Sequence, residues 1–125
     1  MSKVLTIEEL QTEIHDNAVR KGFWEEPVNI AEKLMLIVTE VAEMCEADRK
    51  KVRCFVTPDT YKETSDEDFK LYFQQHIKDT FEDEMADTVI RLLDMAKKLD
   101  IPLEAHIRAK MRYNSLRPYK HGKAY

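Results

Sequence analysis

Residues that turn or break a chain are scarce in this sequence, which has only two glycines and four prolines among its 125 residues. The remainder is highly charged and rich in leucine, methionine, alanine and glutamate, a composition that favours long helices over many short strands. The length suits one domain with a modest core. We therefore expect an all-α fold, a helical bundle of about four to five helices in a single domain over 1–125.

Capping residues and apolar spacing predict where these helices begin and end. Thr6 followed by Glu9 is a capping box, and Asn29 is a capping residue for the second helix. The predicted helices cover about 7–20, 30–50, 65–77, 81–99 and 102–116. Residues 51–78 hold turn-forming and β-branched residues, and we expect a loop and short helix inserted there.

Charge and hydropathy exclude several classes of protein. Lysine and arginine total 20 and aspartate and glutamate 24, a net charge of -4 that gives no broad attraction for nucleic acid. No apolar run approaches the roughly 18 residues of a membrane span, and the first residues lack a signal-peptide core. Cys45 and Cys54 are too few for a disulfide framework and fit no common zinc spacing. We expect a cytoplasmic protein without membrane or nucleic-acid partners.

Two glutamates interrupt the otherwise mostly apolar stretch LIVTEVAEMCEA at 36–47. On a wheel of about 100° per residue, one stripe of this helix is apolar: Leu34, Ile37, Val38, Val41 and Cys45. A second row on roughly the opposite side holds both acids: Leu36, Glu40, Glu43 and Ala47. Carboxylates in a partly buried row repel each other and lose hydration unless a cation lies between them. The pair is a candidate metal site, although solvated glutamates have the same spacing.

The helix predicted at 81–99 carries a second acid pair of the same spacing, Glu84 and Asp87. An exposed polar face with an Asp87–Arg91 ion pair also accounts for this helix. If the two long helices pack antiparallel, however, all four carboxylates converge. A set of oxygen ligands without histidine or cysteine selects hard cations such as Mg²⁺ or Mn²⁺.

Motifs over about residues 11–123 resemble those of the MazG-like all-α nucleotide pyrophosphohydrolases, which include dimeric dUTPases and dCTP pyrophosphatases. TEVAE and EMAD, which hold the four acids, resemble the ExxE and ExxD halves of that family's signature. HDNAVRKGFW resembles its entry segment, through His15, Lys21 and Trp24. AKMRYNSLRPYKHGK resembles its terminal KxxxNxxR element, through Lys110, Asn114 and Arg117. The 40 residues between the acid pairs, longer than in compact members, are a departure.

The resemblance implies Mg²⁺-dependent hydrolysis of a nucleoside triphosphate to the monophosphate and pyrophosphate, in a bundle completed by dimerisation or tetramerisation. It implies four metal ligands: Glu40, Glu43, Glu84 and Asp87. It implies Glu40, Glu43 and Lys110 as catalytic residues, with the choice of water-activating carboxylate left open. The substrate contacts that it implies are His15, Lys21, Trp24, Lys110, Asn114 and Arg117, with Phe23 as an alternative stacking residue.

Other interpretations of the same residues remain open. Trp24 also suits a core anchor, His15 a structural hydrogen-bonding residue, and Lys110 and Arg117 ordinary surface cations. A non-catalytic helical oligomerisation module derived from such an enzyme has the same apolar patterning. A nucleic-acid binder using the basic C-terminal segment is disfavoured by the net charge.

Overall fold

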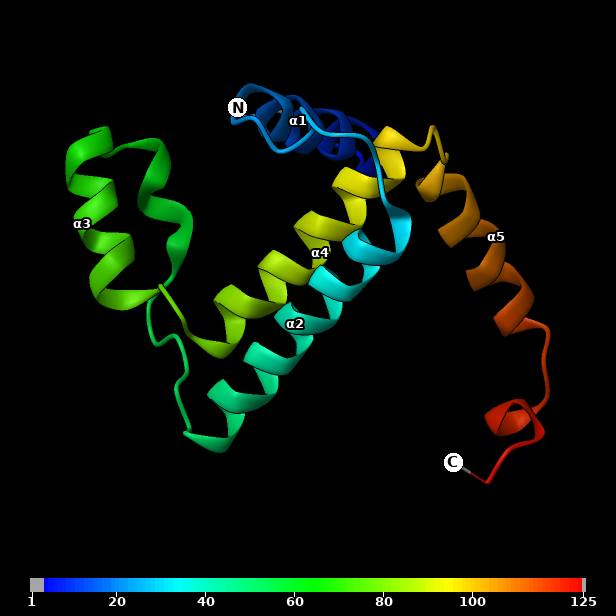
Figure 1. The fold of residues 1–125 in the computed structure, drawn as a ribbon. Helices are drawn as coiled ribbons and strands as arrows, with labels where there is room; N and C mark the ends of the chain where they lie inside the picture. Colours follow the sequence, from blue (N-terminus) through cyan, green and yellow to red (C-terminus); the bar gives the residue numbers. More distant parts are fainter. Residues whose placement is uncertain (1–3, 125) are drawn as a thin grey trace. The chain divides into compact units, whose positions relative to one another are not determined.

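The computed structural model describes residues 4–124, with Thr60 described through its backbone alone. Over this range the fold is all-α without strands, which confirms the predicted class. Its elements, labelled in Figure 1 where there is room, are α1 (Ile7–Arg20), α2 (Ile30–Arg49), η1 (Pro58–Lys62), α3 (Asp66–His76), α4 (Phe81–Lys98), α5 (Leu103–Ser115) and η2 (Tyr119–Gly122), where η marks a 3₁₀ helix. None of the described helices combines the length and apolar character needed to cross a membrane.

The helix starts follow from side chains that satisfy free backbone N–H groups. The two predicted caps, Thr6 and Asn29, each accept a hydrogen bond from the N–H three residues further on, and Ser65 does the same at the start of α3. The predicted break at 78–80 is confirmed, and its buried Thr80 begins α4. The Thr80 hydroxyl accepts a hydrogen bond from Asp83 N at 3.2 Å and donates one to Ile77 O at 2.7 Å.

The described chain forms two compact units. We call residues 4–27 and 93–124 the terminal unit and residues 28–92 the central unit. The first 12 residues of α4 belong to the central unit and the remainder to the terminal unit. The prediction of one domain over 1–125 stays a prediction.

The terminal unit is held by hydrogen bonds between α1 and the segment that leads into α5. Ile7 N donates to Glu104 Oε1 at 3.0 Å, and Gln11 Nε2 donates to Ile101 O at 3.0 Å. Leu93 and Ala96 are its buried apolar side chains. These contacts fix the N-terminal helix against a segment about 90 residues later in the chain.

In the central unit, α2 and the start of α4 lie side by side and run in opposite directions (Figure 1). Phe81 N donates to Val52 O at 2.9 Å, which joins the end of α2 to the start of α4. Arg53 Nε donates to Glu82 Oε1 at 2.6 Å and its guanidinium lies 4.6 Å from the Phe81 ring centroid. The antiparallel arrangement on which the predicted convergence of acids depends is therefore present.

The face of α2 that the chain buries differs from the more apolar stripe of its sequence. Of that stripe only Ile37 is buried, whereas Leu34, Val38 and Val41 are each about half exposed, Val38 by 55%. The second row supplies more of the buried face, through Glu40 and Ala47. Both sides of α2 carry apolar residues, and the more apolar stripe is the one left largely exposed.

Segment 51–78 contains η1 and α3, in agreement with the predicted loop and short helix. The Phe69 ring packs against Tyr61 and Phe73, with ring centroids 6.2 and 5.9 Å away. Ile77 is buried at the end of this segment. The aromatic side chains thus pack on one another, and the description of the segment as an insertion stays a prediction.

Candidate metal centre

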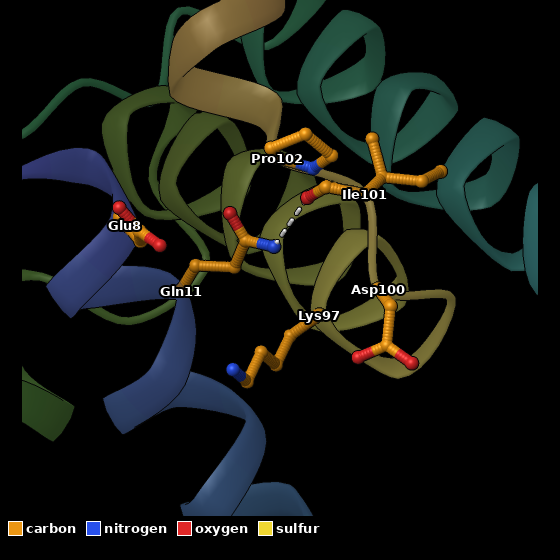
Figure 2. Close-up of a pocket in the computed structure, with 6 residues that line it drawn as sticks. All are labelled: Glu8, Gln11, Lys97, Asp100, Ile101 and Pro102. Atoms are coloured by element: carbon orange, nitrogen blue, oxygen red, sulfur yellow. Dashed lines mark hydrogen bonds between the residues drawn. The ribbon is translucent and has the colours of Figure 1, made fainter.

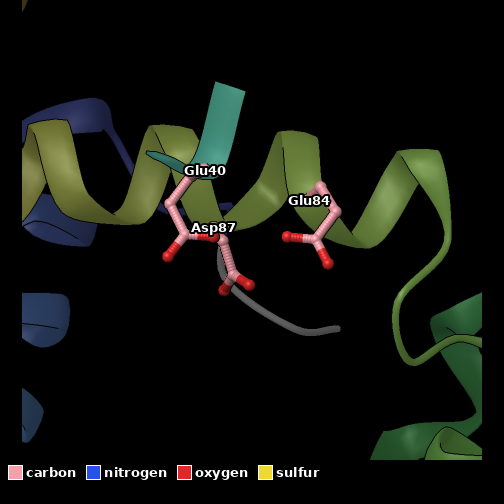
Figure 3. Close-up of side chains that lie close together, drawn as sticks. All are labelled: Glu40, Glu84 and Asp87. Carbon is pink, nitrogen blue, oxygen red and sulfur yellow. The ribbon is translucent and has the colours of Figure 1, made fainter. Parts of the chain in front are cut away.

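Three of the four predicted acids converge in the central unit. Glu40 comes from α2, and Glu84 and Asp87 come from consecutive turns of α4 (Figure 3). One carboxylate oxygen from each lies within 4.8 Å of the others. Glu43 is exposed and lies outside this group of three, but its carboxyl is near enough to hydrogen-bond Glu84. We call these four residues the carboxylate cluster.

Glu84 is the most buried member of the carboxylate cluster. Its side chain is only 5% exposed, and its Oε2 has no hydrogen-bond partner among the described residues. Burial, followed by a hydrogen bond and charge repulsion from Glu43, raises the pKa of Glu84 from 4.5 to about 7. The predicted alternative of an exposed polar face on this helix is therefore wrong at Glu84.

Among the described residues, Arg91 is the cation that forms an ion pair with the carboxylate cluster. Arg91 Nε donates to Glu40 Oε1 at 2.8 Å, across from α4 to α2, rather than forming the Asp87 pair that the sequence suggested. Burial and the charges of Asp83 and Glu40 raise the pKa of Asp87, and Arg91 opposes them. One guanidinium leaves most of this negative charge uncompensated, so the cluster favours either a proton on Glu84 or a bound cation.

The cluster fits a small divalent cation in both chemistry and size. Octahedral Mg²⁺ holds oxygens at about 2.1 Å, which places neighbouring ligands roughly 3–4 Å apart. The three oxygens lie within 4.8 Å of one another, which is near enough for one cation to be shared among them. The unpartnered Oε2 of Glu84 is the ligand atom that the protein itself leaves unsatisfied.

A second group of acids, Asp79, Asp83 and Glu84, also brings three oxygens within 4.8 Å. Here the local backbone explains the arrangement. Asp79 has a φ of 65° and donates its N–H to Asp83 Oδ2 at 2.9 Å, while Lys78 Nζ lies 2.8 Å from Asp79 Oδ2. These contacts organise the turn before α4, and we assign this group to the helix start.

Two predicted substrate contacts meet a third residue in the terminal unit. His15 Nδ1 lies 2.7 Å from Asp94 Oδ1, and Trp24 Nε1 donates to both Asp94 oxygens at 3.0 and 3.1 Å. The His15 and Trp24 rings meet edge to face at 5.6 Å, and Lys98 Nζ lies 5.8 Å from the Trp24 centroid. These contacts support the structural interpretation of both residues, and their predicted contact with substrate stays a prediction.

Replacing Asp94 by alanine is expected to destabilise the protein by about 2 kcal/mol, because Trp24 Nε1 and the His15 ring lose a shared, mostly buried partner. Urea unfolding followed by fluorescence measures this directly, since Trp24 is the sole tryptophan. Asp16→Ala, on the exposed surface of α1, is the matched control and should change stability by less than about 0.5 kcal/mol. Equal stability of the two variants would show that Asp94 does not anchor these rings.

The remaining predicted substrate contacts also lie in the terminal unit. Lys21 is exposed at the end of α1. Lys110 and Asn114 lie on α5, and Arg117 follows two residues after it. Both cations approach one ring: Lys110 Nζ lies 5.2 Å and Arg117 Cζ 5.7 Å from the Tyr113 centroid.

A cavity of about 200 Å³ in the terminal unit involves none of the predicted site residues. Figure 2 shows its lining residues: Glu8, Gln11, Lys97, Asp100, Ile101 and Pro102. Gln11 is buried and donates Nε2 to Ile101 O, while its Oε1 has no hydrogen-bond partner among the described residues. The cavity is therefore separate from the carboxylate cluster, whose residues all belong to the central unit.

The sequence pattern missed the structural roles of two residues. It paired Arg91 with Asp87 instead of Glu40, and it gave Asp94 no role. The polar row of α4 continues beyond Asp87 at helical spacing, through Arg91 and Asp94, and this spacing could have indicated that both residues share the face of the acids.

Comparison with models of known protein families, with curated proteins and with solved structures gave no match.

Proposed function

We propose that this protein is a Mg²⁺-dependent nucleoside triphosphate pyrophosphohydrolase, which converts an NTP or dNTP to the monophosphate and pyrophosphate. The observation that carries the proposal is the buried, unpartnered Oε2 of Glu84 within a cluster of carboxylates from two helices. A helix pair held together only by packing has no use for such a group, because burying it costs stability. The family resemblance of the motifs supplies the reaction.

The four acids divide between two tasks in the proposed reaction. Glu40, Glu84 and Asp87 hold the cation, and Arg91 fixes the orientation of Glu40 through its 2.8 Å hydrogen bond. Bound Mg²⁺ (or Mn²⁺) supplies positive charge against the triphosphate and acidifies water. Glu43 is exposed beside this group, so it is suited to accept the proton of the attacking water.

The family resemblance adds three proposed substrate contacts, all of which belong to the terminal unit. Lys110, Asn114 and Arg117 follow one another at offsets of four and three residues, which places them on one side of α5 and its continuation. Lys110 and Arg117 neutralise phosphate oxygens, and the two-pronged guanidinium of Arg117 suits a phosphate. Asn114 offers a hydrogen bond to the sugar or phosphate.

A homodimer or homotetramer is part of the proposal. The uncovered side of α2 exposes Leu34, Val38 and Val41, and α4 exposes Met85 and Val89 by nearly half. Apolar rows of this kind on paired helices are typical of surfaces that another subunit covers. The same rows suit the alternative function, a non-catalytic oligomerisation module.

Product analysis tests the proposal. The protein is incubated with a panel of NTPs and dNTPs and Mg²⁺, and the products are separated by anion-exchange chromatography. Monophosphate and pyrophosphate in equal amounts are expected, and EDTA should abolish their formation because the carboxylate cluster then has no cation. Diphosphate with orthophosphate would contradict the proposed bond cleavage. Absence of turnover across the panel would favour the oligomerisation module.

A further inference from the structure

Tyr113 lies between Lys110 and Arg117, the two cations of the terminal KxxxNxxR element. Its ring centroid is 5.2 Å from Lys110 Nζ and 5.7 Å from Arg117 Cζ. Lys110 lies one turn before Tyr113 on α5, and Arg117 lies four residues after it. A single aromatic ring therefore contacts both charged groups.

This arrangement counteracts the tendency of two like charges to separate. Free lysine and arginine side chains sample many rotamers and point away from one another in water. The face of a tyrosine ring attracts a cation through its quadrupole, and each such contact at an exposed site contributes roughly 0.5–1 kcal/mol. Both cations are therefore restrained beside the same ring while their polar hydrogens stay available, since Lys110 and Tyr113 are exposed.

Arg117 has a further restraint from the C-terminal segment. Its Nη2 donates a long hydrogen bond to His121 O at 3.5 Å. His121 belongs to η2, where the backbone folds back through two residues with positive φ, Lys120 at 54° and His121 at 53°. The guanidinium is thus held by the ring of Tyr113 and approached by the returning chain.

We infer that Tyr113 is a positioning residue, whose ring holds Lys110 and Arg117 as a preorganised clamp for a polyphosphate. The inference rests on the proposed function in taking a triphosphate as the anion. The clamp binds through charge-assisted hydrogen bonds from the ammonium and guanidinium groups, and Tyr113 itself does not touch the substrate. Its contribution is to remove the loss of side-chain freedom that binding otherwise incurs.

The test compares Tyr113→Leu, which removes the ring, with Tyr113→Phe, which keeps it. Loss of the ring should raise KM for the nucleotide about five- to tenfold and leave kcat within about twofold, because prearranged phosphate contacts serve substrate and transition state alike. Tyr113→Phe should behave as the wild type. Tyr119→Leu is the matched control, since Tyr119 is an exposed tyrosine near a single cation, Lys120, with Nζ 5.8 Å from its centroid.

Calorimetric titration with inorganic triphosphate in EDTA separates this inference from the proposed function. Without divalent cations the carboxylate cluster cannot bind the anion, so the titration measures the basic residues alone. We expect Tyr113→Leu to weaken binding about five- to tenfold and Tyr113→Phe to restore it. This pattern in a protein that hydrolyses no nucleotide would leave the clamp standing and remove the proposed function.

Three results would each overturn the clamp. They are the absence of triphosphate binding by the wild type, wild-type affinity of Tyr113→Leu, and equal weakening by Tyr113→Leu and Tyr113→Phe. The last would mean that the hydroxyl, rather than the ring, is responsible. Circular dichroism checks that the variants stay helical, which is expected because Tyr113 is 58% exposed.

Discussion

Replacing Glu84 by glutamine is expected to make the metal-free protein more stable and the enzyme nearly inactive. Glu84 is 5% exposed, and its pKa of about 7 means that ionisation is unfavourable in the folded chain. At pH 8 the wild type nevertheless carries this charge, so the neutral amide should raise the free energy of unfolding by about 1–2 kcal/mol. Turnover should fall about 10²- to 10³-fold, because a ligand that holds the charge-neutralising cation is lost.

Mg²⁺ should stabilise the wild type and Glu84→Gln to different extents. Saturating Mg²⁺ should raise the free energy of unfolding of the wild type, because a ligand that binds the folded state stabilises it. The glutamine variant should gain much less. Urea unfolding with and without Mg²⁺ gives the free energy of unfolding of each protein under both conditions.

Glu46→Gln is the matched control for this substitution. Glu46 lies on α2, and among the described residues its carboxylate pairs with Arg49 and Lys50 at the surface, at 3.6 and 3.5 Å. Its replacement should change stability by less than about 0.5 kcal/mol and leave turnover unchanged. If Mg²⁺ stabilised Glu84→Gln as strongly as the wild type, the carboxylate cluster would not be the cation site.

The helices could be predicted from the sequence because their boundaries depend on local interactions. Thr6, Asn29 and Ser65 each accept the hydrogen bond that a capping residue is expected to accept. The stop before α5 is likewise local, since Asp100 adopts a φ of 54° and Pro102 precedes the first helical residue. Signals of this kind need no knowledge of what packs against the helix.

The choice of buried face on α2 could not be predicted, because it depends on which elements lie beside the helix. Val38 and Val41 are more apolar than Glu40, yet the chain leaves the valines about half exposed and buries the glutamate. A helical wheel ranks faces by hydropathy, and it contains no information about the partner. The buried carboxylate is stable only with partners from another helix, such as Arg91.

Long-range pairing also limited the prediction of the site. The rule for i,i+4 pairs assigned Arg91 to Asp87, whereas the structure pairs it with Glu40, 51 residues earlier. Asp94 likewise contacts His15 and Trp24, which lie 79 and 70 residues away in sequence. The equal spacing of the two acid pairs did predict that carboxylates from both helices meet, and three of them do. Side chains at matching intervals on two antiparallel helices can face one another.

Stability of the metal-free protein is expected to fall as the pH rises from about 5 to about 8. Glu84 has a pKa of about 7 in the folded chain and about 4.5 when solvated, so the folded state binds the extra proton. Its contribution is fully present below pH 4.5 and is lost as the pH rises through 7. Asp87, whose pKa is also raised, adds in the same direction. Urea unfolding in EDTA across this range measures the slope, and the slope should be smaller in Glu84→Gln.

The same proton competes with Mg²⁺, so metal affinity should rise with pH where stability falls. Below pH 7 the cation must displace the Glu84 proton, and the apparent Kd should weaken about tenfold for each unit of decreasing pH. Above about pH 7.5 the affinity should become nearly constant. Calorimetric titration in two buffers of different ionisation enthalpy counts the protons released per bound cation. About one proton is expected at pH 6 and almost none at pH 8. A Kd that stays constant from pH 6 to pH 8 would contradict Glu84 as a ligand, because its carboxylate changes protonation within that interval.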